Sequence, residues 1–501
     1  MKILFVSLPN PLGVWVNRDY CGGFGSAFPV KKGVRRQVWP PLFDAYAAAV
    51  LIDQSFDVRI VDAVAEGFST DQLLHRVKEE NPEIVVGRIS LPAFDNDVKV
   101  MGEIKQAVEG ATLIGWGSIC KVEAETSLAK SKLDIVIRDE LEFVIPEVAK
   151  KLQTNEGLTA VKGISFKSQD KIIHNPDRPF EKNLDILPIP AYYLLPMEKY
   201  VSLESHFVQG GSKSKEIPFF VMLASRGCSF NCMYCPYPAI FGPWRGRSPG
   251  RVVDEMEILA SDYKVQAIWF HDQTFSMFPE QAAEICDDIV KRKINVHWAC
   301  ETRADKLPSS LVKKMKRAGC SIIQVGVETG DTELVEKVGK RGNTIGSIED
   351  SLRRVQNEGI SLITNFIVGL PDDSWKTIQN TARFIKRMKP DDVAISLLTP
   401  YPGTPFFDKA ASEGWLVSTD WNNYSTTTPV ICQPNFSEND MLLAKEYLLH
   451  VAYSSAASKK IVQSFKKRQI EQALKAVGLT LPLFGKTLYC TAKVKIHKLF
   501  Y

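Results

Sequence analysis

The chain has 501 residues, of which 45% are apolar and 24% are charged. These proportions are typical of a globular protein of about three domains, and they exclude collagen-like, disordered and disulfide-scaffold classes. The net charge of +4 is too small to indicate nucleic-acid binding.

The N-terminus, MKILFVSLPNPLG, lacks the long apolar core and the small-residue cleavage site of a secretory signal, so we expect no export. No apolar run approaches the roughly 18 residues that span a bilayer. Ten cysteines in a chain of this length indicate thiols kept reduced in a cytoplasm. The sequence therefore predicts a cytoplasmic protein.

The first part of the chain, residues 1–152, alternates short apolar strands with amphipathic helices. This alternation predicts an open parallel α/β sheet of Rossmann-like type. Ligands of such sheets lie beyond the carboxyl ends of the strands, here the loops near Pro9, Asp62, Arg88, Trp116 and Arg138. No G-x-G-x-x-G follows the first strand, which disfavours a dinucleotide. The expected strands are 2–8, 57–63, 83–90, 111–117 and 133–139.

Residues 153–215 shift to Pro-, Gly- and Ser-containing stretches and predict a linker. Residues 216–415 then show six strand-like runs with helices between them, which predict a partial (β/α)6 barrel of the TIM type. Residues 416–501 predict a mainly helical C-terminal region. The six runs are 219–225, 267–273, 295–302, 321–329, 362–371 and 393–400.

The last 43 residues, from Lys459, carry ten basic side chains and one acid, a net charge of +9, whereas the rest of the chain carries −5. Apolar residues are interleaved among these charges, so the tail is amphipathic. It either packs as a helix on the barrel or adsorbs to an anionic membrane surface as a peripheral contact. The second alternative would suit a lipid substrate.

The loop after the first barrel strand, RGCSFNCMYCPYP, holds Cys228, Cys232 and Cys235 at C-x3-C-x2-C spacing. Soft thiolates at this density select zinc or an iron-sulfur cluster. A closed zinc site needs a fourth ligand, and the next candidate, His271, lies more than thirty residues on. Three ligands suit a [4Fe-4S] cluster whose fourth iron stays open. The remaining cysteines lack ligand spacing, although Cys300, at a strand end, and Cys21, in a Gly-rich loop, merit attention.

This loop resembles that of the radical SAM superfamily, with Tyr234 at the aromatic position. The resemblance implies that the three cysteines bind a [4Fe-4S] cluster, and that the open iron binds S-adenosylmethionine (SAM) and cleaves it to a 5'-deoxyadenosyl radical. HDQTF (271–275), CETRAD (300–305), GVETG (326–330) and FIVGLP (366–371) match further strand ends. The implied SAM contacts are Tyr234, Glu328, Thr329, Glu301, Arg303, and Gly369 with Leu370. His271, Asp272 and Tyr401 are weaker candidates.

The first domain is similar to the cobalamin-binding domain of one subgroup of this superfamily, on the motifs VDAVAEG (61–67), PEIVVGRIS (82–90), GWGS (115–118) and RDELE (138–142). Two positions depart from that pattern: Trp116 interrupts the usual Gly pair, and Arg138-Asp139 replaces a Gly. The resemblance implies that cobalamin meets the loop with Arg88, Ser90 and Leu91, and that Gly117 and Ser118 also contact it. The alternatives are nucleotide or flavin binding, or a sheet without cofactor.

The resemblance implies a cobalamin-dependent radical SAM enzyme that methylates an unactivated carbon, in a lipid or other hydrophobic substrate or in a small molecule. An electron donor such as ferredoxin or flavodoxin would supply the reductant. Two alternatives remain open. One is a cyclase or C–C bond-forming enzyme on the same scaffold without methyl transfer, and the other is a non-catalytic cobalamin or iron-sulfur sensor.

Overall fold

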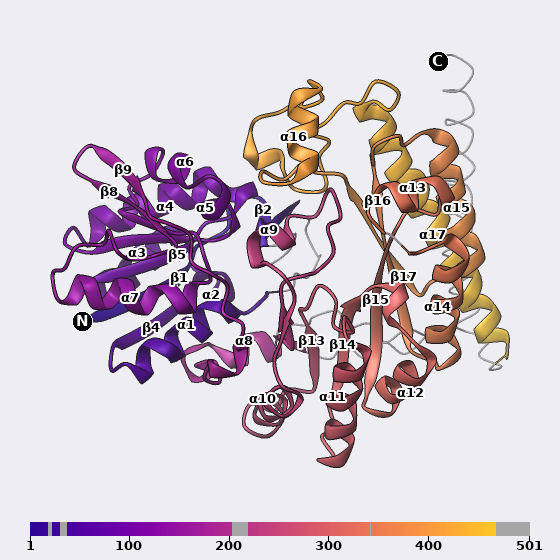
Figure 1. Cartoon of the computed structure of the whole chain (residues 1–501), viewed down its shortest axis with the longest axis horizontal. Helices are drawn as coiled ribbons and strands as arrows, with labels where there is room; N and C mark the ends of the chain where they lie inside the picture. Colours follow the sequence, from indigo (N-terminus) through magenta and orange to yellow (C-terminus); the bar gives the residue numbers. More distant parts are fainter. Residues whose placement is uncertain (19–22, 31–37, 203–218, 341, 467–501) are drawn as a thin grey trace.

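The structure is a computed structural model that describes residues 1–18, 23–30, 38–202, 219–340 and 342–466. Figure 1 shows two lobes side by side, the first in indigo and purple and the second in magenta to yellow. Each lobe is built around its own sheet. Most of the basic tail, residues 467–501, and Cys21 lie outside the described residues, so the membrane hypothesis stays a prediction.

The first lobe holds a seven-stranded sheet in the order β4-β1-β5-β6-β7-β8-β9. The five expected strands are present and parallel, as predicted. The strand order reverses between β1 and β5, and such a switch point is where open sheets bind ligands. The parallel strands are β1 (Lys2–Ser7), β4 (Asp57–Asp62), β5 (Ile84–Arg88), β6 (Thr112–Trp116) and β7 (Ile135–Ile137).

The sheet extends beyond the boundary expected from the sequence. Strands β8 (Ile164–Ser168) and β9 (Lys171–His174) form a hairpin that pairs antiparallel with β7, within the segment predicted as linker. The sequence did not predict these two strands, because they are short and lie between Pro- and Gly-containing stretches. Strand β9 also has no buried residue, so it lacks an apolar pattern. A second unpredicted hairpin, β2 (Val14–Asn17) with β3 (Ser26–Pro29), lies in the loop after β1.

Helices cover the sheet according to their apolar faces. Helix α3 (Thr70–Glu80) begins with a capping box between Ser69 and Gln72 and buries only Leu73 and Val77. Helix α1 (Leu42–Asp53) instead buries nine of its twelve residues. A helix that is apolar all round lies inside a protein, and α1 joins one core with residues of both lobes. The other helices of this lobe are α2 (Ala63–Glu66), α4 (Phe94–Ala107), α5 (Ser118–Val122), α6 (Ala124–Ala129) and α7 (Leu141–Gln153).

The second lobe holds six parallel strands in chain order, β10-β13-β14-β15-β16-β17, as the predicted partial barrel requires. Along β15 to β17, half-buried or exposed residues alternate with buried ones, so one face of the sheet packs on helices and the other opens to a cavity. The strands are β10 (Phe219–Met222), β13 (Ala267–Phe270), β14 (His297–Thr302), β15 (Cys320–Glu328), β16 (Ser361–Val368) and β17 (Asp392–Leu397).

Helices follow these strands, and the long C-terminal helix α17 (Glu438–Lys466) packs on α15 and β17. Figure 1 shows α17 in yellow beside α15. Within the described part of the chain, no helix is both long and apolar enough to cross a membrane. The helices are α10 (Pro249–Ser261), α11 (Pro279–Lys291), α12 (Ser309–Arg317), α13 (Thr332–Lys337), α14 (Ile345–Asn357), α15 (Trp375–Met388) and α16 (Pro405–Ser412).

Buried charges join the two lobes. Arg226, in the second lobe, pairs with Glu140 at 3.2 Å and with Glu142 of the first lobe, and all three side chains are at most 5% exposed. Arg245 also pairs with Glu140, at 2.8 Å. Burial raises the pKa of Glu142, and the neighbouring Arg226 opposes that rise. The charged form of the Glu142 carboxyl group is therefore stabilised by Arg226.

A second buried network surrounds Glu255 of α10. Its carboxylate accepts hydrogen bonds from Tyr46 of α1, at 3.1 Å, and from Tyr192 of the connecting segment, at 2.5 Å, and it pairs with Arg247 at 2.7 Å. Helix α8 (Met197–Ser202), in the same connecting segment, contributes Tyr200, whose hydroxyl donates to Asp62 at the end of β4. The connecting segment is thus hydrogen-bonded to both lobes.

We expect Arg226→Met to lower the free energy of unfolding by about 3–5 kcal/mol, because it leaves Glu142 buried without a counter-charge. Urea denaturation followed by tryptophan fluorescence measures this change. The double variant Arg226→Met/Glu142→Leu should recover part of the loss, since it removes both charges.

The matched control is Arg292→Met. Arg292 pairs with Asp254 at 2.6 Å, but its side chain is 28% exposed, so we expect a change below about 1 kcal/mol. An Arg226→Met protein as stable as this control would contradict the assigned role of the buried pair.

Candidate functional site

A tightly folded loop presents the three cysteines. It begins with β11 (Ser225–Arg226), which pairs antiparallel with β12 (Arg245–Gly246). Gly227 follows at φ +77°, and a Cβ there would lie 2.1 Å from the carbonyl oxygen of Pro243. Only glycine fits this crossing. The Cys228 amide then donates to the Gly242 carbonyl at 3.0 Å, which fixes the start of the loop.

The loop opens onto a cavity, here named the cysteine cavity, of about 600 Å³ in part open to solvent. The structure thus brings the three predicted cysteines together with Tyr234, Glu301, Arg303 and Glu328. The side chains that line the cavity come from the loop and from β13 to β16 with their following loops: Cys228, Phe230, Cys232, Tyr234, Cys235, Gln273, Thr274, Glu301, Thr302, Arg303, Gln324, Gly326, Glu328, Lys340 and Asn365.

Burial raises the pKa of the Cys232 and Cys235 thiols, so their thiolates need cations beside them. In the described residues, no group of three or more His, Cys, Asp or Glu side chains is placed to hold a single metal ion. A [4Fe-4S] cluster makes no such demand, because each thiolate binds a different iron.

Arg303 supplies the cavity with unpaired hydrogen-bond donors. Its residue is 4% exposed, and its Nη1 and Nη2 atoms are buried and have no hydrogen-bond partner among the described residues. Its Nε donates to Asp305 at 2.9 Å, and its guanidinium lies 3.6 Å from the ring centre of Phe230. A buried guanidinium held in this way is suited to a carboxylate ligand.

Glu328 is held at the end of β15 in the left-handed region, at φ +69°. Its carboxylate pairs with Lys340 Nζ at 2.9 Å, and it is hydrogen-bonded to Tyr234. Lys340 also donates to the Gly326 carbonyl at 3.0 Å. A non-glycine residue at positive φ in a binding cavity is strained, and such strain is common at functional sites.

Glu301 of β14 lies at the border with a second space. Burial raises the pKa of Glu301 to about 7, and the neighbouring Trp269 opposes the rise, so the carboxyl group is neutral in part of the molecules at neutral pH. The second space, here named the strand-end cavity, shares seven lining residues with the cysteine cavity and is continuous with it.

Several predicted SAM contacts are not part of these cavities. Thr329 is 2% exposed and accepts a hydrogen bond from the Asp331 amide. Gly369, at φ +93°, faces α17, where a Cβ would lie 2.4 Å from the Cε of Met441, and Leu370 is fully buried. These residues do not line either cavity, and their assignment as SAM contacts stays a prediction.

The HDQTF motif contributes Gln273 and Thr274 to the cysteine cavity. His271 packs on Trp39 with ring centres 5.0 Å apart, and Asp272 accepts hydrogen bonds from Ser225 and from the Ala224 amide. Tyr401 lines the strand-end cavity. Cys300 is 0% exposed and hydrogen-bonded to Cys320, as expected for a core thiol.

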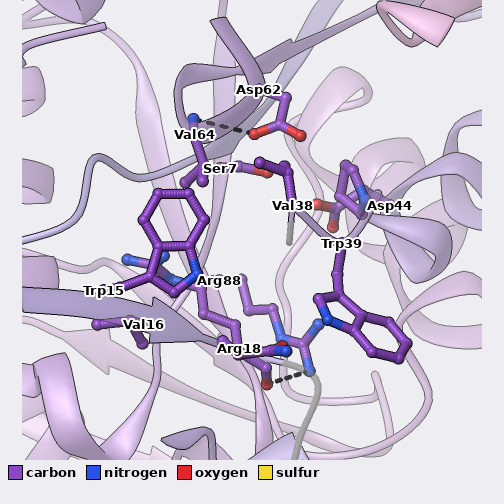
Figure 2. A pocket seen from close by; sticks show the side chains of 12 residues that line it. Ser7, Trp15, Val16, Arg18, Val38, Trp39, Asp44, Asp62, Val64 and Arg88 are labelled. Atoms are coloured by element: carbon purple, nitrogen blue, oxygen red, sulfur yellow. Dashed lines mark hydrogen bonds between the residues drawn. The ribbon is translucent and has the colours of Figure 1, made fainter. Parts of the chain in front are cut away.

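Two cavities lie at the carboxyl ends of the first sheet, where the strand order predicted them. The switch-point cavity has Trp15 and Trp39 on opposite sides, with Arg18 and Arg88 between them (Figure 2). Ser7 and Asp62, at the ends of β1 and β4, also line it. The Arg88 Nη2 atom donates to the Arg18 carbonyl at 2.9 Å. Arg18 in turn pairs with the buried Asp97 at 2.8 Å.

On the other side of Arg88 lies the Trp116 cavity. Its lining includes Gly117 and Ser118, whose contact with cobalamin stays a prediction, and it also includes Phe43, Trp116, Lys121, Arg138, Asp139, Glu140, Leu141, Ile240 and Phe241. The Arg88 guanidinium lies 4.7 Å from the Trp116 ring centre. Gly117 has φ +126°, and a Cβ there would lie 2.4 Å from the Ile89 carbonyl oxygen, so this glycine is required.

Ser90 and Leu91 do not join Arg88 at these cavities. Both are 0% exposed, because Ser90 is hydrogen-bonded to Asp97 and the Leu91 amide donates to the Phe24 carbonyl. The loop turns inward after Arg88. The two departures from the family pattern have structural partners: Trp116 packs on Phe43, and Asp139 pairs with Lys121 at 2.8 Å.

Sequence patterns missed several cavity residues. Lys340 belongs to no recognised motif, and its ion pair with Glu328 forms only because the fold brings the two residues together. Ile240 and Phe241 belong to α9 (Tyr237–Phe241), just after Cys235, yet they line a cavity of the first lobe. Figure 1 shows α9 between the lobes. Gln324 and Asn365 were detectable, because each is a polar residue within an apolar strand.

Comparisons with known proteins agree with this arrangement. The model of the radical SAM superfamily matches residues 222–385, which contain the cysteine loop. An uncharacterized methyltransferase of Pyrococcus horikoshii is 30% identical over 427 residues, which cover 84% of this chain and 90% of that protein. The anaerobic magnesium-protoporphyrin IX monomethyl ester cyclase of Rubrivivax gelatinosus is 25% identical over 414 residues, which cover 81% of this chain and 72% of that protein.

The two-lobed fold also has a close structural counterpart. The cobalamin-dependent S-adenosylmethionine radical enzyme OxsB, solved with aqua-cobalamin and S-adenosylmethionine bound, superposes with a TM-score of 0.71 at 15% identity, covering 95% of this chain and 70% of OxsB. That likeness shows a shared fold. Because the Pyrococcus protein is matched over nine tenths of its length and the superfamily model lies over the cysteine loop, the chain is an enzyme that belongs to the radical SAM superfamily.

Proposed function

We propose that the protein is a cobalamin-dependent radical SAM methyltransferase that methylates an unactivated carbon. The observation that carries the proposal is the continuity of the site. The cysteine loop opens on a cavity that holds the buried Arg303, whose two Nη atoms have no hydrogen-bond partner among the described residues, and α9, which follows that loop directly, lines a second cavity in the first lobe. Two cofactor sites therefore meet at one short segment.

Cys228, Cys232 and Cys235 would hold the [4Fe-4S] cluster that the superfamily uses. Lys340 and Arg303 place two positive charges in the same cavity, and these offset the negative charge of the thiolates. Gly339 passes so close to Cys232 that a Cβ would lie 3.0 Å from its Cα atom. The loop with Gly339 and Lys340 therefore encloses the cysteines.

SAM carries a carboxylate, an amino group and a sulfonium. Arg303 would bind the carboxylate through its free Nη atoms, because a charge-assisted, two-pronged pair is the strongest contact available to it. Glu328, with Tyr234 donating to it, would face the positive groups. Proximity and orientation are the contributions of these side chains.

Cobalamin would occupy the cavities beside Arg88. Two observations support the fit. Both cavities share Arg88 at the end of β5 and lie next to the switch point, the position at which open sheets bind ligands. The Trp116 Nε1 atom is buried in one of them without a hydrogen-bond partner among the described residues, and such a donor suits the amide groups that surround a corrin ring.

When bound, the cluster supplies the electron that cleaves SAM, and cobalamin supplies the methyl group. The chain supplies side chains that fix the geometry of the reacting groups, which radical transfer needs more than a general base. The motifs contain no Ser-His-Asp arrangement, and the proposed reaction does not require one. A reductant is also needed, as for the superfamily in general.

A cyclase without methyl transfer is the second candidate, because the Rubrivivax relative is named as one. The products of SAM separate the two. A methyltransferase consumes a second SAM to restore its methyl donor and releases S-adenosylhomocysteine, whereas ring closure without methyl transfer does not. Since the chain belongs to an enzyme family, we do not propose a sensor.

The test is anaerobic reconstitution with iron, sulfide and cobalamin, followed by dithionite and SAM. We expect about four bound irons, 5'-deoxyadenosine and S-adenosylhomocysteine. Cys228→Ala, Cys232→Ala or Cys235→Ala should lose the cluster absorbance and both products, whereas Cys432→Ala, outside both cavities, should retain them. One bound zinc without iron would refute the proposal, and 5'-deoxyadenosine without S-adenosylhomocysteine would favour the cyclase.

Arg303→Gln should weaken SAM binding about 10- to 100-fold, because a hydrogen bond to a charged group contributes about 1.5–3 kcal/mol. Equilibrium dialysis of labelled SAM with the reconstituted protein measures the change, and iron content should stay at the wild-type level. Arg303→Lys should restore part of the affinity, since it keeps the charge but not the planar fork. Unchanged affinity in both variants would remove Arg303 from the SAM site.

Trp116→Phe keeps an aromatic ring beside Arg88 and removes the unpaired indole N–H. We expect cobalamin to bind about 2- to 10-fold more weakly, the loss of one neutral hydrogen bond, while iron content stays unchanged. Absorbance titration with hydroxocobalamin measures the affinity. Trp375→Phe is the matched control, because Trp375 donates to Asp440 and does not line the Trp116 cavity. Equal affinities in the two variants would contradict the proposed contact.

A further inference from the structure

The carboxylate of Asp97, in the first turn of α4, ties together two loops at the carboxyl edge of the first sheet. Its Oδ1 atom accepts a hydrogen bond from Arg18 Nη2 at 2.8 Å, and Arg18 belongs to the segment that follows β1. Its Oδ2 atom accepts two from Ser90, which follows β5: one from the amide at 3.1 Å and one from the hydroxyl at 3.2 Å. The Asp97 side chain is 0% exposed. These contacts lie at the switch point between β1 and β5.

Arg18 passes this anchoring on to Arg88. The Arg88 Nη2 atom donates to the main-chain carbonyl of Arg18 at 2.9 Å (Figure 2). The other side of the Arg88 guanidinium faces the Trp116 ring, 4.7 Å from its centre. The Arg18 side chain has a second anchor, because its Nη1 atom donates to Asn10 at 3.1 Å. Contacts that fix the Arg18 side chain therefore also fix the acceptor that orients Arg88.

The charge of Asp97 makes this approach of two arginines possible. Arg18 and Arg88 both line the switch-point cavity, and like charges repel in a partly buried space. Burial raises the pKa of Asp97, and the neighbouring Arg18 opposes that rise. The Asp97 carboxylate and the Arg18 guanidinium thus stabilise each other in their charged forms. Because the charges of this pair cancel, Arg88 can bond to the Arg18 carbonyl without strong repulsion.

Stability alone does not account for a buried ion pair at this position, because apolar side chains of similar volume are often at least as stabilising. A buried pair is costly to separate, however, so it holds its partners in one arrangement. The residue that depends on this arrangement is Arg88, which lines both the switch-point cavity and the Trp116 cavity. Fixing its guanidinium fixes the border between the two cavities.

We propose that Asp97 is a positioning residue of the cobalamin site, which acts through Arg18 to hold the Arg88 guanidinium between the two cavities. Asp97 does not line either cavity, so its effect on a ligand there is indirect. The inference rests on the proposed function for the identity of the ligand. It assigns to α4 a role that no motif of the sequence indicates.

A double-mutant cycle between Asp97 and Arg88 tests this role. Hydroxocobalamin is titrated into the protein reconstituted with iron and sulfide, and absorbance measures its affinity. We expect Arg88→Met to weaken binding about 10- to 100-fold, the loss of a hydrogen bond from a charged group. Asp97→Asn should weaken it about 3- to 10-fold, because the amide keeps the shape of the side chain but loses the charge-assisted contact with Arg18.

The combined variant separates positioning from stability. In the Arg88→Met background, Asp97→Asn should change the affinity by less than about 1.5-fold, because no guanidinium remains to be positioned. A residue that merely stabilises the lobe would lower the affinity by the same factor in both backgrounds. Equal factors would therefore overturn the inference, and so would wild-type affinity in a folded Asp97→Asn protein.

Asp95→Asn is the matched control. It makes the same change in the same turn of α4, but Asp95 is exposed, accepts a hydrogen bond from Asn422 at 3.0 Å and does not line either cavity. We expect its affinity for hydroxocobalamin to stay within about twofold of the wild-type value. A loss as large as that of Asp97→Asn would show a general effect of charge on α4 and would overturn the inference.

A milder change gives a second cycle in case Asp97→Asn does not fold, which urea denaturation shows. Asn10→Ala removes the other anchor of the Arg18 side chain at a half-buried position. We expect it to weaken hydroxocobalamin binding about two- to threefold, the loss of one hydrogen bond that acts indirectly. This loss should again disappear in the Arg88→Met background, and its persistence there would overturn the inference.

The wild-type protein tests the proposed function separately. Saturable binding of hydroxocobalamin is expected from the proposed function alone, and its absence would overturn that function and this inference together. Binding by the wild type with independent effects of Asp97→Asn and Arg88→Met would overturn the inference alone. The iron content should equal the wild-type value in every variant, since neither residue lines the cysteine cavity. A loss of iron confined to Asp97→Asn would assign Asp97 to stability and overturn the inference.

Discussion

The buried contact between Arg226 and Glu142 fixes the relation between the two lobes, and the rest of the site depends on it. Arg226 stands two residues before Cys228, and Glu142 lies in the first turn of α7. Glu140, which pairs with both Arg226 and Arg245, also lines the Trp116 cavity. One group of charges therefore holds the cysteine loop against the proposed cobalamin site.

Charges buried in this way rarely stabilise a protein more than apolar residues would, but they are costly to separate. They therefore specify one arrangement of the lobes. The Arg226 guanidinium also lies 5.2 Å from the Phe43 ring centre and 5.3 Å from that of Tyr46. Tyr46 in turn belongs to the Glu255 network. Helix α1 thus contacts both buried networks, which explains why it is buried on nearly all sides.

The sequence predicted the parts of this structure that depend on local pattern. All eleven strands that were expected from apolar runs are present in the structure. The spacing of Cys228, Cys232 and Cys235 identified the loop at the centre of the site. The sequence also located the loops that line cavities in the first lobe, because the carboxyl ends of parallel strands share one edge. Arg88, Trp116 and Arg138 all line cavities there.

What could not be predicted depends on contacts between distant segments. Ser90 and Leu91 lie next to Arg88 in sequence, yet Asp97 and Phe24 draw them into the core. Lys340 reaches Glu328 across a loop with no distinguishing pattern. Gly369 lies so close to Met441 that a Cβ would meet its side chain, a contact that its motif does not indicate. A sequence motif indicates the type of turn that the chain forms. Tertiary packing then determines which side chains of that turn face the cavity.

The distribution of charge over the connected cavities follows from the chemistry that each end must hold. The cysteine cavity gathers thiols, carboxyl groups and two cations, which suits a cluster and a zwitterionic ligand. The part of the strand-end cavity that lies along β16, β17 and the following segment is lined only by hydroxyl-bearing and apolar side chains. A carbon-centred radical reacts with whatever donates a hydrogen atom, and a cavity that places few such donors beside it leaves it few partners other than the intended one.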